Sequence, residues 1–266
     1  MAQLRIFSYL PNPRIWKATI AARLCGVDVE VRGARSAELT DWLWDFDARP
    51  ATKADRDAVN ARAGRVGFKT KALLKTDAFL AAHPFATVPA AFSPDGATGI
   101  FESNSIMRAV ARLASNGPSL YGVDAYEASR IDSFLDSSLV FARDSQIYLL
   151  ALRNPEFAAG IHERAAEAFS NYLAGIEQAL RPDRRFLVGN SLSLADICFV
   201  AELCLFMNER LHWQTLLKRN LEPILKDWEH AGCPLASTHF NRLAEHPAFA
   251  PDVQPYLEKI HARSKQ

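Results

Sequence analysis

Thr87-Val88-Pro89-Ala90 and, shortly after it, Phe101-Glu102-Ser103-Asn104-Ser105-Ile106 are the stretches that decide the fold of this chain. In the first stretch, Val88 is a strong β-former, and Pro89 cannot donate a backbone hydrogen bond. We therefore expect a turn that leads into a short strand, and Pro89 is a candidate for a cis peptide bond.

The second stretch is typical of a strand that passes directly into a helix. Gly99-Ile100-Phe101 ends a predicted strand, and apolar residues from Ile106 onward recur at helical spacing. Ser103 lies between the two and is a preferred N-cap residue. We expect it to place a hydroxyl and free backbone amides at the start of the helix, which is a favourable site for a carboxylate.

Glu102 lies beside this predicted carboxylate site and could bind a cationic amine. A carboxylate site next to an amine site is what the α-amino acid end of a small peptide needs. Ser103 alone could be only a helix cap, and Pro89 alone could only end a loop. Their occurrence together, in this order and at this spacing, favours a binding site.

The composition of the chain argues against several classes of partner. Its 266 residues include 31 basic and 30 acidic side chains, which does not favour nucleic acid or an anionic membrane as the main partner. No apolar run reaches membrane-spanning length, and the N-terminus lacks the apolar core of a signal peptide. The cysteines, at positions 25, 198, 204 and 233, show no CxxC spacing, which favours reduced thiols and a cytoplasmic protein.

The N-terminal part of the chain has the pattern of a strand–helix–strand unit. Leu4–Tyr9 is a predicted strand, Asn12-Pro13 has the residue types preferred at a helix start, and Val27–Val31 alternates like a strand with one exposed face. A further short helix is expected after Thr76, and a hairpin is expected around Ser93–Gly96.

A long insertion, at about residues 37–71, interrupts this part of the chain. It contains Trp42 and Trp44, followed by the charge-rich run Asp45–Arg65. We expect Ala37–Trp44 to form a short helix or an apolar anchor and the charge-rich run to be a mobile segment. A lid beside a site, a dimer contact and a solvated loop are open interpretations of the stretch Trp42–Lys71.

The second half of the chain has helical patterns throughout and predicts a helix bundle. The expected helices are Tyr126–Leu152, Phe157–Leu180, Leu192–Met207, Trp213–Trp228 and Phe240–Glu245. Pro247 is expected to stop the last of them. Ser193 and Asp196 form a predicted capping box that starts a buried helix, where no water could reach the first amides. We give this box a structural role.

The Val-Pro and Glu-Ser motifs together resemble the glutathione-binding half of glutathione transferases. The resemblance implies an α/β N-terminal thioredoxin-like domain over residues 1–114 and an all-α C-terminal helical bundle over residues 125–266. Within that superfamily, the N-terminal sequence looks most like the transferase-like domain of the gamma subunit of eukaryotic elongation factor one. This similarity is found in the stretches Tyr9–Ala18, Ile20–Ala22, Phe79-Leu80 and Phe101–Asn104.

A role in translation is poorly supported by this likeness. The separate C-terminal domain of the gamma subunit has no counterpart here, and the insertion is extra. We expect a stand-alone glutathione transferase relative, with glutathione as co-substrate.

The resemblance also implies roles for individual residues. Val88, with Thr87 and Pro89 around it, corresponds to the residue that offers its backbone to the cysteinyl part of glutathione. Glu102 and Ser103 correspond to the pair that holds the γ-glutamyl group. The lysine that often meets the glycyl carboxylate in the family is absent, so the resemblance implies either a substitute among Lys71, Lys75 and Arg14 or a weak affinity for glutathione.

Glutathione must be held as its thiolate, and the Tyr, Ser or Cys that usually stabilises it has no unambiguous counterpart here. Asn12 is ranked first as the candidate catalytic residue because its amide lies at a helix N-cap, where the helix dipole also favours an anion. Arg14 is second and Tyr9 third. Plain capping is the alternative role of Asn12, and His83 is expected to be a helix-end residue.

The electrophile is expected between the domains, along the long helix after Tyr126. Ser137, Phe141, Ser145 and Tyr148 are candidates to line that pocket, although an aromatic stripe on a helix is more often core than pocket.

Three functions remain open at this stage. The first is attack of the glutathione thiolate on a small hydrophobic electrophile, by a protein that is expected to be a homodimer. The second is a non-catalytic scaffold for protein assembly, motivated by the missing Tyr, Ser or Cys. The third is a glutathione-dependent lyase or ether-cleaving enzyme of aromatic catabolism. No metal is expected in any of them.

Overall fold

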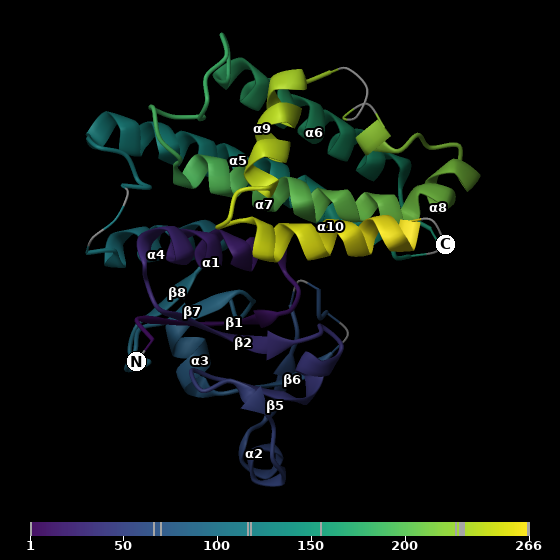
Figure 1. Cartoon of the computed structure of the whole chain (residues 1–266). Coiled ribbons are helices and arrows are strands. Elements are labelled where there is room, and N and C mark those ends of the chain that lie inside the picture. The colour runs from purple at the N-terminus through teal and green to yellow at the C-terminus, as the bar shows by residue number, and fades with distance from the viewer. Residues whose placement is uncertain are drawn as a thin grey trace. The chain divides into compact units, whose positions relative to one another are not determined.

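The fold comes from a computed structural model that describes residues 2–65, 67–69, 71–115, 117, 119–154, 156–226, 228 and 232–264. The chain divides into two compact units, Met1–Pro118 and Ser119–Gln266. The first unit is α/β and the second is helical (Figure 1). The fold class that the sequence predicted is therefore confirmed.

A four-stranded sheet with the strand order β2-β1-β7-β8 is the centre of the first unit. β1 and β2 run parallel and are joined by α1, which confirms the predicted strand–helix–strand unit. β7 runs antiparallel to both β1 and β8. The elements around this sheet are β1 (Leu4–Tyr9), α1 (Pro13–Cys25), β2 (Val29–Ala34), β7 (Ala90–Phe92), β8 (Gly99–Phe101) and α4 (Ser103–Leu113).

Local sequence explains where α1 begins and ends. Asn12 is the N-cap and its side chain accepts a hydrogen bond from the amide of Arg14, while Pro13 is the first helical residue. Gly26 ends the helix in the left-handed conformation, at φ 68°. α1 packs against α4, and Figure 1 shows both helices on one face of the main sheet.

The insertion is folded, so the expectation of a mobile segment after Trp44 is wrong for the part that the structure describes. It forms a second four-stranded sheet with the order β4-β3-β6-β5. Thr52 and Asp55 form a reciprocal capping box that starts α2. Its elements, with the helix that follows, are the 3-10 helix η1 (Glu38–Asp41), β3 (Trp42–Trp44), β4 (Arg49–Pro50), α2 (Lys53–Ala58), β5 (Ala61–Ala63), β6 (Ala72–Lys75) and α3 (Asp77–Ala82).

Buried aromatic residues explain why the insertion folds. Trp44 is 1% exposed, and its ring meets Phe7 of β1 and Phe79 of α3 edge to face, at centroid distances of 5.4 and 5.9 Å. Leu73 of β6 is fully buried in the same cluster. The expected apolar anchor is therefore confirmed, and Figure 1 shows the second sheet and α3 on the face of the main sheet away from α1 and α4.

The second unit is helical in all its described elements, but its C-terminal part differs from the prediction. The helix that starts at Trp213 ends at Lys218, and a long helix follows Pro247. That last helix accommodates Pro255, and Val253 and Ile260 bury its apolar side. The elements are α5 (Ala125–Ala151), α6 (Ala159–Ala179), α7 (Leu194–Phe206), η2 (Met207–His212), α8 (Trp213–Lys218), η3 (Ile224–Lys226), α9 (Pro234–Ala244) and α10 (Ala250–Ser264).

The predicted capping box at the start of α7 is confirmed and is part of a larger network. Asp196 is fully buried and accepts hydrogen bonds from the amide and the hydroxyl of Ser193, both at 2.8 Å. It also accepts from the amide of Leu187 at 3.0 Å and lies 2.8 Å from Nε2 of His239. The cap thus joins α7 to the preceding loop and to α9.

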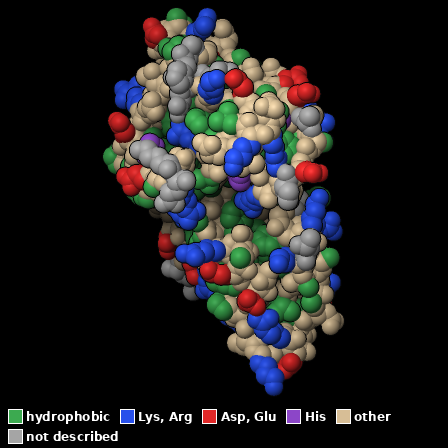
Figure 2. All heavy atoms as spheres, turned by 90° about the vertical axis from the view of Figure 1, so that its right-hand side faces the viewer, with side chains coloured by type: hydrophobic (Ala, Val, Ile, Leu, Met, Phe, Trp, Pro, Cys, Tyr) green, Lys and Arg blue, Asp and Glu red, His purple; other side chains and the backbone are tan. Residues whose placement is uncertain are grey.

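The remaining general features concern the surface charges, the hydropathy of the helices and the cysteines. Figure 2 shows basic and acidic side chains interspersed on the face that it presents. In the described part of the chain, no helix is long and apolar enough to cross a membrane. The four cysteines are free, and those at positions 25, 198 and 204 are buried. Among the described residues, no group of three His, Cys, Asp or Glu side chains could hold a metal ion.

Candidate functional site

The pairing of β7 with β8 brings the two diagnostic stretches of the sequence to the same end of the main sheet. Ala90, the first residue of β7, pairs with Phe101, the last residue of β8. In an antiparallel pair, one step back along one strand matches one step forward along the other. Pro89 is therefore next in register to Glu102.

β1 ends at the same place, on the other side of β7. Phe7 pairs with Ala90 as the last pair of this ladder, and Tyr9 is the last residue of β1, two residues further on. The end of β1, the turn before β7 and the start of α4 therefore form one edge of the sheet, which we call the sheet-end site (residues 8–14, 87–89 and 102–104).

The turn before β7 has the backbone geometry that the sequence suggested. The peptide between Val88 and Pro89 is cis, so that expectation is confirmed. Thr87, Val88 and Pro89 are half-buried. Within the described residues, the backbone of Val88 forms no hydrogen bond, because the ladder of β7 begins only at Ala90. Its amide and carbonyl could therefore pair with an extended peptide.

The start of α4 corrects the sequence analysis in one respect. Glu102, and not Ser103, is the N-cap, since the amide of Ile106 donates to the carbonyl of Glu102 at 2.9 Å and closes the first turn there. Glu102 has φ 67°, which non-glycine residues seldom adopt, and its side chain is exposed. Ser103 is the first helical residue and is 6% exposed. Such backbone outliers are common at binding sites.

Asn12 has the capping role that the sequence left open as an alternative. Its Oδ1 accepts from the amide of Arg14 at 3.0 Å, and its Nδ2 donates to Oγ of Ser8 at 3.1 Å. Asn12 is 1% exposed, whereas Arg14 and Tyr9 are half-buried. Tyr9 packs against the aromatic cluster around Trp44. The three candidates for the thiol therefore lie at one edge, and two of them keep exposed surface.

Lys75 is not at the surface, so it does not offer a free ammonium to a ligand carboxylate. It is 1% exposed, and its Nζ donates to the carbonyls of Ala86 at 3.0 Å and Ala63 at 3.3 Å. The ammonium also lies 5.1 Å from the centroid of the Trp44 ring. Burial lowers the pKa of Lys75 below its usual value, and nearby Arg65 lowers it further. Lys71, by contrast, is exposed.

His83 is a helix-end residue, as expected, and it is also buried beside the site. It caps the C-terminus of α3 and is 1% exposed. Its Nε2 lies 3.2 Å from the hydroxyl of Thr87, and its ring stacks on Phe101 at 5.0 Å. Burial, reinforced by the charge of Lys75, lowers its pKa to about 4. The sequence showed neither of these two buried bases, because a Lys or His in an amphipathic stretch has no distinguishing local signal.

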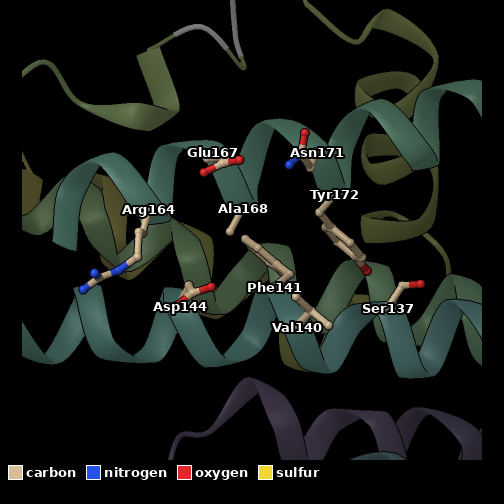
Figure 3. Close-up of a pocket in the computed structure, with 9 residues that line it drawn as sticks. All are labelled: Ser137, Val140, Phe141, Asp144, Arg164, Glu167, Ala168, Asn171 and Tyr172. Carbon is tan, nitrogen blue, oxygen red and sulfur yellow. The ribbon is translucent and has the colours of Figure 1, made fainter. Parts of the chain in front are cut away.

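The residues predicted to line an electrophile pocket separate into two groups. Ser137 and Phe141 line a cavity of about 490 Å³ on α5 and α6, where Phe141 stacks on Tyr172 at 4.6 Å (Figure 3). Ser145 and Tyr148 do not line this cavity. The hydroxyl of Ser145 donates a hydrogen bond to the carbonyl of Phe141. Ser145 and Tyr148 are both buried.

Tyr148 is a core residue of the second unit. It is fully buried, and its hydroxyl donates to Oε1 of Glu209 at 2.6 Å. Burial raises the pKa values of both groups, most strongly for the tyrosine. This hydroxyl is therefore committed to the fold, in line with the core alternative that the sequence left open.

Comparison with known sequences identifies the helical unit. The family model of the glutathione S-transferase C-terminal domain matches residues 144–247. Elongation factor 1-gamma 1 of Oryza sativa subsp. japonica is 34% identical over 131 residues, which are 48% of this chain and 30% of that relative. Glutathione S-transferase F9 of Arabidopsis thaliana is 33% identical over 132 residues, covering 46% of this chain and 59% of that relative. The chain thus spans about a third of the elongation factor and just over half of the transferase.

Solved structures extend the likeness over nearly the whole chain. A glutathione S-transferase from Methylobacillus flagellatus with glutathione bound has a TM-score of 0.63 at 15% identity and covers 94% of this chain and 98% of its own. A theta class transferase from Xanthomonas axonopodis pv. citri, also with glutathione bound, has a TM-score of 0.61 at 18% identity and covers 95% and 98%. At these identities the structures show a glutathione transferase fold, and the sequence comparisons show a glutathione S-transferase C-terminal domain over residues 144–247 in a chain that is similar to elongation factor 1-gamma.

Proposed function

We propose that this protein is a glutathione transferase that binds glutathione at the sheet-end site and directs its thiolate onto a hydrophobic electrophile. The observation that carries the proposal is the register of β7, in which Ala90 pairs with Phe7 of β1 on one side and with Phe101, the residue before Glu102, on the other. Transferases of the same fold with glutathione bound support the choice of ligand.

Each part of glutathione has a proposed partner in this site. The backbone of Val88 receives the cysteinyl part, with Thr87 and Pro89 forming the turn around it. The exposed carboxylate of Glu102 binds the γ-glutamyl amine. Ser103, with the first amides of α4, binds the γ-glutamyl carboxylate, because the positive end of a helix favours an anion.

Isothermal titration with glutathione tests this proposal. Wild-type protein should release or absorb heat at millimolar glutathione, and Glu102→Gln should weaken binding about 10-fold or more, because it removes a charge-assisted hydrogen bond. Glu38→Gln, an exposed carboxylate of the insertion, is the matched control and should bind like wild type. Absence of heat from the wild-type protein would reject glutathione as the ligand.

The sulfur requires a group that favours the thiolate, since a free thiol titrates at about pH 8.5. We propose Asn12, Arg14 and Tyr9 as the candidate catalytic residues. Asn12 would act from the positive end of α1, while Arg14 and Tyr9 keep surface that a ligand can reach. The roles of the three residues are separated by the variants Asn12→Ser, Arg14→Met and Tyr9→Phe. Asn12→Ser keeps a residue that can cap the helix. The variant that raises the pKa of bound glutathione, followed by the ultraviolet absorbance of the thiolate, identifies the donor.

For the electrophile, we propose the cavity on α5 and α6 that Ser137 and Phe141 line and whose rim carries the charged side chains Asp144, Arg164 and Glu167. The stacked pair of Phe141 and Tyr172 supports an aromatic or otherwise hydrophobic substrate. We further propose a cytoplasmic protein, which the four free cysteines support. A panel of electrophiles assayed against wild type and Phe141→Ala would show whether this cavity selects the substrate.

A non-catalytic scaffold is the second candidate, and the similarity to elongation factor 1-gamma favours it. It predicts a stable complex with another protein in a pull-down, together with no turnover of any electrophile by a protein that still binds glutathione. Turnover that is lost in the thiol variants above would exclude it.

A further inference from the structure

Lys75 is a buried cation in the first unit for which the proposed reaction gives no role. The side chain is 1% exposed, and no carboxylate among the described residues forms an ion pair with it. Burying an ammonium without a carboxylate is costly unless other groups replace its water shell. Here two carbonyl oxygens and the face of an indole ring replace that shell.

The groups that Lys75 joins come from separate parts of the chain. Ala63 and Trp44 belong to strands β5 and β3 of the insertion, and Ala86 belongs to the turn before β7. The ammonium is therefore the point at which the second sheet holds that turn. Lys75 is itself the last residue of β6, the strand that pairs with both β5 and β3.

Ala86 is a position where such support matters. Its φ of 53° is in the left-handed region, which an alanine seldom adopts because its Cβ is crowded there. Because a peptide unit is planar, fixing the carbonyl of Ala86 also fixes the amide of Thr87. Only Thr87 then separates this fixed peptide from Val88, whose backbone is proposed to receive the cysteinyl part of glutathione.

His83 contacts the same turn through Thr87. Its Nε2 is 3.2 Å from the hydroxyl of Thr87, and its ring stacks on Phe101, the residue before Glu102. A pKa of about 4 keeps the imidazole neutral at physiological pH, so that it does not repel the nearby ammonium. The turn thus contacts one buried cation and one neutral ring.

We propose that Lys75 is a positioning residue for glutathione: its ammonium couples the inserted sheet to the Ala86 carbonyl and thereby sets the backbone of Val88 that receives the cysteinyl part of the ligand. This rests on the proposed function. It assigns the insertion a role as a support for the binding turn in place of a lid over it.

Titration calorimetry with two thiol peptides tests the proposal. Lys75→Met keeps a long apolar side chain against Trp44 but removes the hydrogen bonds of the ammonium. It should lower the affinity for glutathione about 10-fold or more. The affinity for γ-glutamylcysteine, which lacks the glycyl carboxylate, should fall by the same factor, because Lys75 acts through the protein backbone. Lys53→Met, at an exposed lysine of the same insertion, is the matched control and should bind both peptides like wild type.

Lys75→Arg keeps the donors and the charge and should restore part of the affinity for both peptides. Lys75→Arg also tests the proposal if circular dichroism shows that Lys75→Met does not fold. The larger guanidinium must displace the Ala86 carbonyl, so Lys75→Arg should bind both peptides more weakly than wild type, by the same factor. Unchanged affinity in a folded Lys75 variant would overturn the proposal. A loss for glutathione but not for γ-glutamylcysteine would also overturn it, since Lys75 would then meet the glycyl carboxylate directly. No heat from wild-type protein would reject the proposed function itself, and this inference with it.

Discussion

His83 shows how one buried side chain makes stability depend on pH. Its pKa in the folded chain is about 4, below the ordinary value of 6.5. Between these values the unfolded chain binds a proton that the folded chain does not. The contribution of neutral His83 to the free energy of unfolding is therefore fully present above pH 6.5. It falls by up to about 3 kcal/mol as the pH drops toward 4.

His83→Gln removes this titrating group and should flatten the decline of stability between pH 6.5 and 4. Urea unfolding of wild type and variant at several pH values measures it. His261→Gln, an exposed histidine at the end of α10, is the control and should decline like wild type. An equal decline in His83→Gln would show that other groups carry the acid sensitivity.

Tyr148 and Glu209 form a second buried polar pair, in the helical unit. Glu209 accepts from the Tyr148 hydroxyl at 2.6 Å and from the amides of Ile224 and Leu225 at 2.9 and 2.8 Å. Tyr148→Phe leaves the buried carboxylate with one donor fewer, and we expect a loss of about 1–3 kcal/mol in the free energy of unfolding. Tyr126→Phe, at an exposed tyrosine, should change it by less than about 0.5 kcal/mol. Equal effects would mean that the pair contributes nothing specific.

At the scale of elements, the two capping boxes have the same chemistry but different surroundings. Asp196 is fully buried, whereas Asp55 on α2, a helix with no buried residue, pairs with Arg49 and Thr52 and keeps 14% of its side chain exposed. Removing the acceptor from a buried network leaves donors that water cannot reach. Water can reach the partly exposed Asp55.

Asp196→Ala should therefore cost about 3–5 kcal/mol in the free energy of unfolding, and Asp55→Ala, which loses the ion pair with Arg49 but leaves groups that water can reach, should cost clearly less. Thermal and urea unfolding of the two variants side by side measure the difference. Similar losses would contradict the idea that burial, and not the motif, sets the energetic value of the cap.

At the scale of the whole molecule, α5 presents apolar side chains to solvent. Leu139, Val140 and Ile147 are 41, 68 and 42% exposed. We propose that this surface contributes to a homodimer, because exposed apolar clusters of this kind commonly mark contacts between proteins.

Ile147→Glu places a charge in that surface, outside the cavity that Val140 lines, and should shift the protein from dimer to monomer in analytical ultracentrifugation, without lowering its unfolding midpoint by more than a few degrees. Val123→Glu is a matched control, since Val123 is exposed at 77% before the start of α5. A wild-type monomer at micromolar concentration would reject the dimer.

Local chemistry in the sequence was sufficient for the features that depend on few neighbours. Asn12-Pro13 started α1, Ser193 and Asp196 started α7, and the turn at Pro89 has its cis peptide. The class of each unit followed from periodicity alone, because burial of one face imposes a repeat of 2 or 3.6 residues.

The tertiary structure alone decided the features that depend on contacts distant in sequence. The insertion looked mobile because its residues are polar, yet Trp44 and Leu73 bury it against the main sheet. The position of Lys75 under the turn at Ala86 depends on the pairing of β5 and β6, which no local pattern encodes. The sequence determined which motifs this protein has, and the register of β1, β7 and β8 decided that they meet at one end of a sheet, because strand pairing joins residues far apart in the chain.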